Sequence, residues 1–558
     1  MKKFKKIKNK VLIVDKNDTI DSVFREMALP SKTSVKLKGV AFITKEQKLL
    51  GIVTDGDIRR AYGSNINFNS KISQIMNKKY IYYSLEKERL SNVYNLENLN
   101  YNFYPILDSK KNLVDIVRRE ELILKDNYEV TVFGLGFVGL TLAASLSEIG
   151  FNVTGLDNNV NVTNSIKQNK PEIFEPGLKE ILNQCLNKNL FISNKVVNKK
   201  SNVYIICVGT PISKDKSPDL RSILEVLSSL VNFLKKGDTI FLRSTLPTGT
   251  SRKIIAPYIE KNTSLKIGKD IFLAFTPERT VEGNAISELS SLPQIVGGFS
   301  KNCTEKARSF WSNLSKAIIE VDGIEAAEMV KLINNTFRDV SFAFANEVAL
   351  KCDEYNIDSF DLISAANKGY PRNKISLPSP GVGGYCLTKD PVLFYQNSKK
   401  NFFSLAKTGR LINEKMINYP LKHIKRFTSS KKIKTKDLKV LFLGIAFKGI
   451  PETNDLRGST AIDLYNKLIS KVAKIDFYDF VIKESFKDFK RVEIDKSIRN
   501  NYDCIFILNN HPSNKDVLKE LLSFTNPVLF FDGWNLIDKK IATKNDNIVY
   551  SSLGYISE

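Results

Sequence analysis

A glycine-rich turn at residues 134–139 constrains the fold of this chain more than any other feature. The segment GLGFVG follows the apolar run VTVF and opens a helix-like run, LTLAASLSEIG. In such a strand–turn–helix unit the first glycine allows a tight turn and the second lets the backbone approach a pyrophosphate. The third lets helix and strand pack closely, with the phosphate at the helix N-terminus. The expected dinucleotide contacts are Gly134, Gly136, Phe137, Val138 and Gly139.

An acidic residue ends the following strand-like run, FNVTGLD. At this position Asp157 would hydrogen-bond a ribose 2′-hydroxyl and repel a 2′-phosphate. The glycine turn alone is weak evidence for dinucleotide binding, but the turn and the carboxylate in this context predict NAD as the cofactor.

Apolar runs alternate with helix-like segments from residue 130 to about residue 320, which is typical of a doubly wound, parallel sheet. Two loops follow strand-like runs, VGTP at 208–211 and RSTLPTGT at 243–250. Ligands bind at such strand ends, so Thr210 and Thr245 are expected to contact the cofactor or hold water. Ordinary turn chemistry is the alternative reading of both loops.

Polar linkers divide the chain near residues 127 and 430. Residues 323–366 carry a long helical pattern, and a second set of strand-like runs begins at Leu438. We therefore expect an α/β fold with two Rossmann-like, doubly wound domains joined by a long central helix region and preceded by a smaller α/β pair. The expected parts are 1–127 (the smaller α/β pair), 128–322 (NAD-binding), 323–430 (central helical and dimerisation region with a cysteine loop) and 431–558 (the second doubly wound domain).

The segment SPGVGGYCLTKDP, residues 379–391, places three glycines before a cysteine and a Lys-Asp pair after it. A thiol attacks a carbonyl as the thiolate, and a nearby lysine or a helix N-terminus lowers its pKa. Cys386 is therefore the expected nucleophile, with a lowered pKa. The other five cysteines lack such surroundings.

From about residue 128 to its end, the chain resembles the nucleotide-sugar dehydrogenases, the family of UDP-glucose and UDP-N-acetylmannosamine 6-dehydrogenases. The matching segments occur in the family's order: GLGFVGL, EPGL, VGTP, RSTLPTGT, TPER, EMVKLINNTF, PGVGGYCLTKD and LGIAFKGIPETNDLRGS. The resemblance implies oxidation of a sugar C6 alcohol to a carboxylate with two equivalents of NAD+ per turnover. A sugar aldehyde would be captured by Cys386 as a thiohemiacetal, oxidised to a thioester and hydrolysed.

The resemblance also assigns roles to other residues. Lys331 and Asn335 would stabilise the developing oxyanion, while Asp390 with Thr210 and a water would deprotonate the alcohol. Glu278 would be the base for the hydrolytic water, although the division of base work among Lys331, Asp390 and Glu278 stays open. The expected substrate contacts are Glu278, Arg279, Lys331, Asn335, Arg372, Gly383, Lys448 and Arg457, with Lys448 also near the cofactor.

Segments that differ between branches of the family bear on the sugar. The segments ANKGYPR and PERTVEGNAISELSSLPQIVGG resemble the N-acetylhexosamine branch of the family. Two departures weaken that assignment, because Tyr385 stands where that branch usually has His and Lys389 is more familiar from the UDP-glucose branch. We expect a UDP-N-acetylhexosamine, with UDP-glucose as the alternative.

Residues 8–125 contain two strand–turn–strand–helix repeats that resemble a CBS-domain pair. The segment GIVTDGD, residues 51–57, resembles the part of that family which contacts the ribose of an adenine nucleotide, through Thr54 and Asp57. The second repeat has Val-Arg-Arg-Glu at 117–120, so one nucleotide site is expected at most. The module could equally serve only packing or oligomerisation.

Composition excludes several classes. The net charge is +24, with 84 basic and 60 acidic residues, and the excess is dispersed, so we expect a solvated surface and no nucleic-acid partner. Two histidines and six scattered cysteines suggest neither a metal site nor disulfides. Without a membrane-length apolar run or a signal peptide, a cytoplasmic protein is expected. The long helical stretch at 323–366 is the expected dimer seam, so we expect a homodimer or higher homo-oligomer.

Two other functions were compatible with parts of the sequence. A two-electron 3-hydroxyacid dehydrogenase shares the glycine turn and the long helix, but it needs neither Cys386 nor a third domain. A nucleotide-sensing protein with an inactive dehydrogenase part would make the N-terminal pair the main functional unit. The complete set of expected catalytic positions argues against both.

Overall fold

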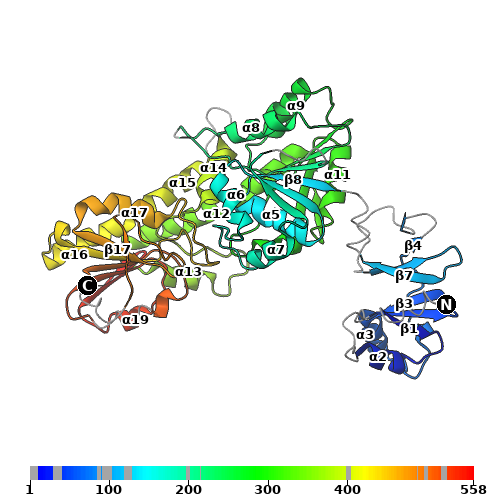
Figure 1. The fold of residues 1–558 in the computed structure, drawn as a ribbon. Coiled ribbons are helices and arrows are strands. Elements are labelled where there is room, and N and C mark those ends of the chain that lie inside the picture. The colour runs from blue at the N-terminus through cyan, green and yellow to red at the C-terminus, as the bar shows by residue number, and fades with distance from the viewer. Residues whose placement is uncertain are drawn as a thin grey trace. The chain divides into compact units, whose positions relative to one another are not determined.

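A computed structural model of the chain describes residues 11–28, 40–84, 89–90, 103–118, 128–195, 201–213, 215–396, 404–486, 488–494, 501–516 and 524–557. Contacts between residues divide the chain into two compact units, Met1–Asn127 and Tyr128–Glu558. Figure 1 shows both as ribbons, and each unit is described by itself.

Unit 1 holds two small sheets with related hairpins. The first sheet contains β1 (Leu12–Asp15), β2 (Val40–Lys45) and β3 (Lys48–Thr54), with helices α2 (Ile20–Ala28) and α3 (Asp55–Gly63). The second, in the order β5-β4-β6-β7, contains β4 (Tyr83–Ser84), β5 (Arg89–Leu90), β6 (Phe103–Leu107) and β7 (Leu113–Arg118). The antiparallel pairs β2–β3 and β6–β7 each shift register once, after Ile43 and after Ile106.

The two repeats of unit 1 pack through these hairpins. The backbone N–H of Leu49 donates to the carbonyl of Lys111 (3.1 Å), and that of Leu113 donates to Gln47 (3.0 Å). Phe42, Leu49, Leu107 and Leu113 share one buried cluster. The predicted pair of repeats therefore has a common core. Arg119 and Glu120, which the sequence analysis compared with Thr54 and Asp57, lie outside the described residues.

The first sheet of unit 2 contains short strands, such as VYII and TIFL, in which every residue is buried. Such runs suit a sheet that is covered by helices on both faces (Figure 1). In sheet order the strands are β10 (Leu190–Ser193), β9 (Asn152–Leu156), β8 (Glu129–Phe133), β11 (Val203–Ile206), β12 (Thr239–Leu242), β13 (Phe272–Phe275), β14 (Gln294–Gly298) and β15 (Ile318–Glu320).

Most of this sheet is parallel, as the sequence predicted. The exceptions are β14, which runs antiparallel to β13, and β15, which is parallel to β14. The covering helices are α5 (Phe137–Glu148), α6 (Val160–Lys167), α7 (Leu178–Cys185), α8 (Arg221–Leu230), α9 (Ala256–Asn262), α10 (Ala285–Ser291) and α11 (Lys301–Trp311).

The middle of unit 2 is helical, with α12 (Ile324–Asp353) running between the two sheets (Figure 1). The prediction of one long helical stretch over 323–366 was wrong at its end. Asn356 takes a left-handed conformation (φ 51°), and the Asp358 side chain caps a new helix, α13 (Ser359–Asn367). The remaining helices are α14 (Tyr385–Tyr395), α15 (Leu405–Met416) and α16 (Tyr419–Lys431).

A buried polar network fixes α15 against α12. Arg410 Nη1 lies 2.6 Å from Asp339 Oδ1, and both side chains are almost fully buried. The Asn413 amide donates to the same carboxylate oxygen (2.8 Å). Arg410 also donates to the carbonyls of Val382 (3.0 Å) and Leu387 (3.1 Å), so the network reaches the cysteine loop.

The second sheet of unit 2 repeats the strand order of the first. In sheet order its strands are β18 (Lys490–Arg491), β17 (Lys474–Tyr478), β16 (Lys439–Leu443), β19 (Cys504–Ile507), β20 (Val528–Asp532), β21 (Ile548–Ser552) and β22 (Tyr555–Ile556). Helix α17 (Thr460–Leu468) follows β16 after a long loop, and α19 (Lys539–Ala542) precedes β21. The described residues of 431–558 thus form a second doubly wound sheet.

Candidate active site

The glycine turn after β8 has the geometry that a pyrophosphate site needs. Gly134 takes a left-handed conformation (φ 86°), which favours glycine. A Cβ on Gly139 would lie 1.7 Å from the Gly134 carbonyl oxygen, so that position admits only glycine. A Cβ on Gly136, the N-cap of α5, would meet nothing within 4 Å. Open space at a helix N-terminus fits an incoming phosphate.

A cleft of about 470 Å³ opens at this turn. Asp157 lies at its wall, with Oδ2 accepting from the Leu135 N–H (2.8 Å) and Oδ1 from the Asn159 N–H (2.9 Å). The sequence analysis missed several lining residues: Asn194, Lys195, Ser222, Glu225 and Ser229. Asn194 and Lys195 directly follow β10, so their place at the carboxyl end of a parallel strand could have indicated them.

The cysteine loop is packed tightly against a loop that follows β16. A Cβ on Gly383 would lie 2.3 Å from the Gly458 carbonyl oxygen, and one on Gly384 would lie 2.8 Å from the Phe447 ring. The Gly384 N–H donates to the Gly458 carbonyl (3.1 Å). Close backbone approach therefore explains the glycines, and it places Cys386 at the second position of α14.

The expectation of a lowered thiol pKa was wrong. The Cys386 side chain is exposed on one side, whereas the other five cysteines are buried or half-buried. Surrounding protein atoms desolvate its sulfur and Asp390 adds a negative charge, so the pKa of the thiol is raised although Lys331 and Lys389 oppose this. The Cys386 thiol is therefore protonated at neutral pH.

A chain of polar contacts links α12, α14 and the strand-end loops. Asn335 donates to Asp390 Oδ2 (2.6 Å), and Lys389 Nζ lies 3.5 Å from Asp390 Oδ1. Lys389 also donates to Thr210 Oγ1 (3.4 Å), which in turn donates to the Thr245 carbonyl (2.6 Å). Burial lowers the pKa of the Lys389 ammonium. Four of the expected residues, Asn335, Asp390, Thr210 and Thr245, therefore lie in one chain of contacts. Lys389, which was not among the expected site residues, connects Asp390 to Thr210.

Lys331 and Glu278 meet on the other side of this group. Lys331 Nζ donates to the Glu278 carbonyl oxygen (2.8 Å). The Glu278 carboxylate accepts from the N–H groups of Arg279 and Thr280 (2.7 Å each) and pairs with Arg243, which is fully buried. Burial opposes ionisation of Glu278, but Arg243, the Thr280 N–H and Lys331 together outweigh it, so its pKa is lowered. Arg243 is a structural partner that the sequence analysis left without a role.

The expected substrate cations are already paired within the protein. Arg457 holds Asp455 in a bidentate contact (Nε to both carboxylate oxygens, 3.0 Å each), and its Nη2 lies 3.5 Å from Glu282. Lys448 Nζ donates to the Glu282 carbonyl oxygen (2.8 Å). Burial, together with the charge of Asp455, raises the pKa of Glu282. Glu282, which the sequence analysis missed, is thus the common neighbour of both cations.

Two other expected substrate residues have local partners. Arg279 is half-buried, and its guanidinium donates to the Pro293 carbonyl. Arg372 is exposed between α13 and α14, where its Nη1 donates to the Tyr370 hydroxyl (3.1 Å). No contact between Arg372 and the Cys386 group is recorded among the described residues.

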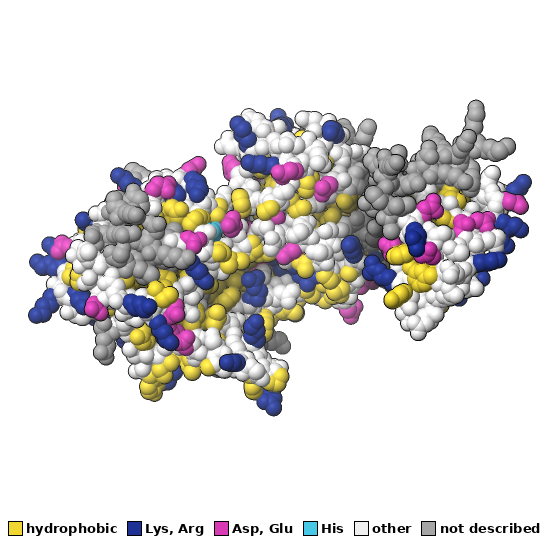
Figure 2. Space-filling view, turned by 90° about the horizontal axis from the view of Figure 1, so that it is seen from below, with side chains coloured by type: hydrophobic (Ala, Val, Ile, Leu, Met, Phe, Trp, Pro, Cys, Tyr) yellow, Lys and Arg dark blue, Asp and Glu magenta, His cyan; other side chains and the backbone are white. Residues whose placement is uncertain are grey.

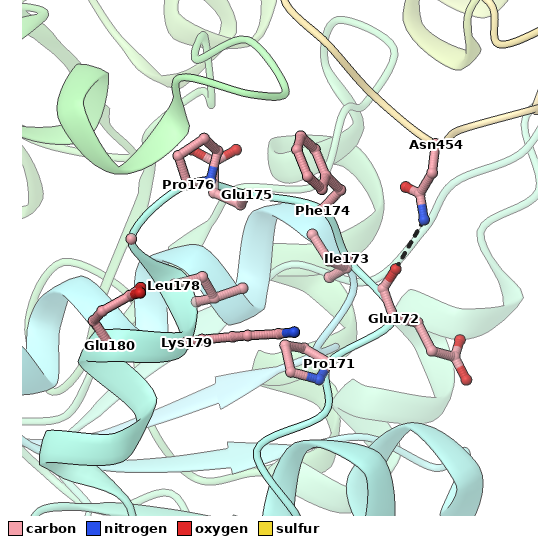
Figure 3. A pocket seen from close by; sticks show the side chains of 11 residues that line it. Pro171, Glu172, Ile173, Phe174, Glu175, Pro176, Leu178, Lys179, Glu180 and Asn454 are labelled. Carbon is pink, nitrogen blue, oxygen red and sulfur yellow. Dashed lines mark hydrogen bonds between the residues drawn. The ribbon is translucent and has the colours of Figure 1, made fainter. Parts of the chain in front are cut away.

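A second cleft, of about 360 Å³, lies along residues 171–180, which include the EPGL segment (Figure 3). Asn454 closes it from the loop after β16 by donating to the Glu172 carbonyl (3.2 Å). Within the EPGL segment, Glu175 accepts from the Gly283 N–H (2.8 Å). This cleft therefore lies between loops of the two sheets and contains none of the expected site residues.

Thr54 and Asp57 in unit 1 form a helix cap. The Thr54 hydroxyl and N–H both donate to Asp57 Oδ2 (2.7 and 2.8 Å), and the Asp57 N–H donates back to Thr54 Oγ1 (3.3 Å). Arg60 Nη2 lies 2.5 Å from the other Asp57 oxygen. In this structure both side chains stabilise the start of α3.

A dinucleotide cleft beside a cysteine, lysines, an amide and a carboxylate defines unit 2 as a dinucleotide-dependent dehydrogenase. Three profiles of the UDP-glucose/GDP-mannose dehydrogenase family match it: the NAD-binding domain at 128–315, the central domain at 325–415 and the UDP-binding domain at 441–539. The chain belongs to this family, and it is an NAD-dependent oxidoreductase. A CBS-domain profile matches residues 5–64, the first repeat of unit 1.

Similar proteins agree with this assignment. A UDP-N-acetyl-D-mannosamine dehydrogenase from Pyrococcus horikoshii is 33% identical over 73% of this chain and 96% of its own length. The solved UDP-D-ManNAc dehydrogenase from P. horikoshii has a TM-score of 0.69 and 31% identity, covering 76% of this chain and 99% of that one. The solved UDP-N-acetyl-mannosamine dehydrogenase from Staphylococcus aureus has a TM-score of 0.66 and 31% identity, covering 76% and 98%.

The surface adds two observations. On the face seen in Figure 2, basic side chains are scattered among acidic ones and form no continuous stripe. Among the described residues, no helix combines the length and the apolar character needed to cross a membrane.

Proposed function

We propose that this enzyme oxidises the C6 alcohol of a UDP-N-acetylhexosamine, of the UDP-N-acetylmannosamine type, to the carboxylate through a covalent intermediate on Cys386. The observation that carries the proposal is the position of Cys386 at the start of α14, four residues before Asp390, which Asn335 of α12 holds. Relatives named as UDP-N-acetylmannosamine dehydrogenases support the sugar class.

In the first oxidation Asp390, with Thr210 and a water, accepts the hydroxyl proton. NAD+, when bound in the cleft at the glycine turn, would accept one hydride in each oxidation, so two NAD+ would be consumed per turnover. Lys331 and Asn335 come from one face of α12, where an ammonium and an amide can stabilise the oxygen as it gains charge. Lys389, in contact with both Thr210 and Asp390, completes this group.

The aldehyde is then captured by Cys386. Its raised pKa means that the thiol carries its proton until attack, so forming the C–S bond must deliver that proton to the aldehyde oxygen, through Asp390 or Lys331. Transfer of a second hydride to a second NAD+, with loss of the thiohemiacetal hydroxyl proton to Asp390, gives the thioester. Covalent capture keeps the reactive aldehyde in the site between the two oxidations.

Hydrolysis of the thioester is assigned to Glu278 as the base. Arg243 keeps its carboxylate ionised, which a base requires, but also occupies one of its oxygens. Glu278 must therefore release a hydrogen bond, from Arg279 or Thr280, before it accepts a proton from water. The Glu278 carbonyl meanwhile fixes Lys331.

The product counts and the Cys386→Ser variant test this function together. The wild-type enzyme should form two NADH for each sugar consumed, and a panel of UDP- and GDP-sugars should give the highest kcat/KM for a UDP-N-acetylhexosamine. Cys386→Ser should lose uronate formation by more than about 1000-fold, because a hydroxyl is a poor nucleophile without an activating base. Full uronate formation by that variant would refute the covalent mechanism, and a preference for UDP-glucose would support the alternative substrate.

We further propose that the enzyme is cytoplasmic and that its product is used in the synthesis of a surface polysaccharide. We also propose that the enzyme is a homodimer. Helix α12 leaves a row of large apolar side chains exposed, including Met329, Ile333, Phe337 and Phe344, with Phe337 74% exposed. A row of this kind fits a helix face covered by a second copy. Phe337→Glu should give a monomer in light scattering, and an unchanged dimer would exclude this face.

Unit 1 is proposed to bind an adenine nucleotide at Thr54 and Asp57 and to tune activity. Binding would require Asp57 to exchange its cap contacts for ribose hydroxyls. A chain lacking residues 1–127 should lose any response to ATP, ADP or AMP. If activity and oligomeric state are unaffected by these nucleotides in the full chain, unit 1 has only a packing role.

A further inference from the structure

Tyr385 connects parts of the active site that belong to different elements. It is the first residue of α14, directly before Cys386, and it is half-buried. The Lys389 ammonium and the Arg457 guanidinium each lie 5.0 Å from the centre of its ring. Both distances are within the range of an attractive cation–π contact. One aromatic ring therefore neighbours two cations, from α14 and from the loop after β16.

These two cations serve different sides of the site. Lys389 is buried and contacts Thr210 and Asp390, the residues proposed to take the alcohol proton. Arg457 is about half exposed and is the proposed anchor of the nucleotide sugar. Because the Tyr385 ring contacts both side chains, it fixes the position of Arg457, the substrate contact, relative to Lys389, which belongs to the proton-transfer group.

The Tyr385 hydroxyl points to the cofactor side. A Cβ on Gly209 would lie 3.9 Å from the Tyr385 oxygen, and Gly209 lines the dinucleotide cleft next to Thr210. Among the described residues, no hydrogen bond to this hydroxyl is recorded. Burial raises the pKa of Tyr385, so its hydroxyl is protonated and able to donate at neutral pH.

We propose that Tyr385 is a positioning residue with two separable parts. Its ring holds Lys389 and Arg457 in place for the nucleotide sugar, and its hydroxyl donates a hydrogen bond to the bound dinucleotide at Gly209. The inference rests on the proposed function, because it assumes that Arg457 anchors the substrate and that Lys389 belongs to the proton-transfer group.

Steady-state kinetics of the full chain separate the two parts. Tyr385→Phe keeps the ring, so KM for NAD+ should rise about 5-fold for one lost hydrogen bond, while KM for the UDP-sugar stays within about 2-fold. Tyr385→Leu also removes the ring, so KM for the UDP-sugar should rise about 10-fold for two lost cation–π contacts. Tyr395→Leu, at the far end of the same helix, controls for general damage to α14.

A titratable positive charge at residue 385 gives a readout that a purely structural role would not produce. The groups around the side chain are Lys389, Arg457, Asp390 and Cys386. In Tyr385→His the ring becomes cationic below about pH 6.5 and repels both cations. KM for the UDP-sugar should therefore rise more steeply from pH 8 to pH 6 in this variant than in the wild type. This variant also serves if Tyr385→Leu does not fold.

Several outcomes would overturn the inference. An active wild type with an unchanged Tyr385→Phe excludes the hydroxyl contact. Equal UDP-sugar KM values for the Phe and Leu variants exclude the ring contact, as does a Tyr385→His profile parallel to the wild type. A wild type that oxidises no nucleotide sugar would instead overturn the proposed function, and this inference with it.

Discussion

The two sheets of unit 2 have the same strand order but use the end of their first strand differently. After β8, α5 begins at Phe137, within the glycine turn, and its N-terminus faces the open cleft. After β16, Gly444 also takes a left-handed conformation (φ 81°), but α17 begins only at Thr460. The first loop borders a cleft on its own sheet, whereas the second loop contacts the cysteine loop and Glu282.

The acidic residues after the second strands show the same contrast. Asp157 is half-buried and lines the cleft, with one backbone N–H on each oxygen. Asp479 is buried and accepts from four backbone N–H groups, those of Ile445, Ala446, Val481 and Ile482. One carboxylate is left available to a ribose, and the other is entirely used to hold its loop. Equal topology therefore does not imply equal ligand binding.

The largest effect should come from the glycine turn. Gly139→Ala places a Cβ against the Gly134 carbonyl, so we expect no folded NAD-binding domain and no activity. Gly136→Ala has room for its Cβ, and should fold but bind NAD+ more than about 10-fold more weakly, by blocking the phosphate. Circular dichroism and NAD+ titration distinguish the two. A folded, active Gly139→Ala enzyme would contradict the packing argument.

Substitutions of Asp479 and Asp157 should give the next largest effects, one on stability and the other on NAD+ binding. Asp479→Ala leaves four buried N–H groups without their acceptor, so the free energy of unfolding should fall by about 3 kcal/mol with KM for NAD+ unchanged. Asp157→Ala should instead raise KM for NAD+ about 10-fold with a smaller loss of stability. Thermal unfolding beside NAD+ kinetics tests the contrast. It fails if both variants change the same quantity.

The pH dependence of stability should show a smaller effect. Burial raises the pKa of Asp238, before β12, and of Asp532, at the end of β20, each to about 6. The folded state therefore binds their protons more tightly than the unfolded state does, so stability falls as pH rises from about 4 to about 6. In Asp238→Asn, and likewise in Asp532→Asn, the free energy of unfolding should fall less over this pH range, by up to about 2–3 kcal/mol for each substitution. Melting curves from pH 4 to pH 7 measure it, and unchanged slopes would argue against both shifts.

Local features of the fold and the site could be predicted from the sequence. The glycine turn, the cysteine loop and the apolar strands depend on neighbouring residues, so their spacing carries the information. The family resemblance then supplied residues that α12 and α14 bring together, such as Asn335 and Asp390.

Features that depend on three-dimensional neighbours were not predictable. The pKa of Cys386 follows from desolvation and from Asp390, and not from the lysine that the sequence places nearby. The pairing of Arg457 with Glu282 joins residues that are far apart in the chain. The antiparallel β14 and the end of α12 at Asp353 follow from sheet and cap geometry rather than from hydrophobic periodicity.

The raised pKa of Cys386 has a consequence for the chemical durability of the enzyme. Peroxide and alkylating agents react with thiolates, and a protonated thiol is a poor target for either. Although exposed, Cys386 should therefore be modified slowly by iodoacetamide at pH 7, and faster as the pH rises toward its pKa. Mass spectrometry of the treated enzyme would measure these rates. If Cys386 is the nucleophile, as we propose, the thiol stays unreactive toward such reagents until it attacks the substrate carbonyl.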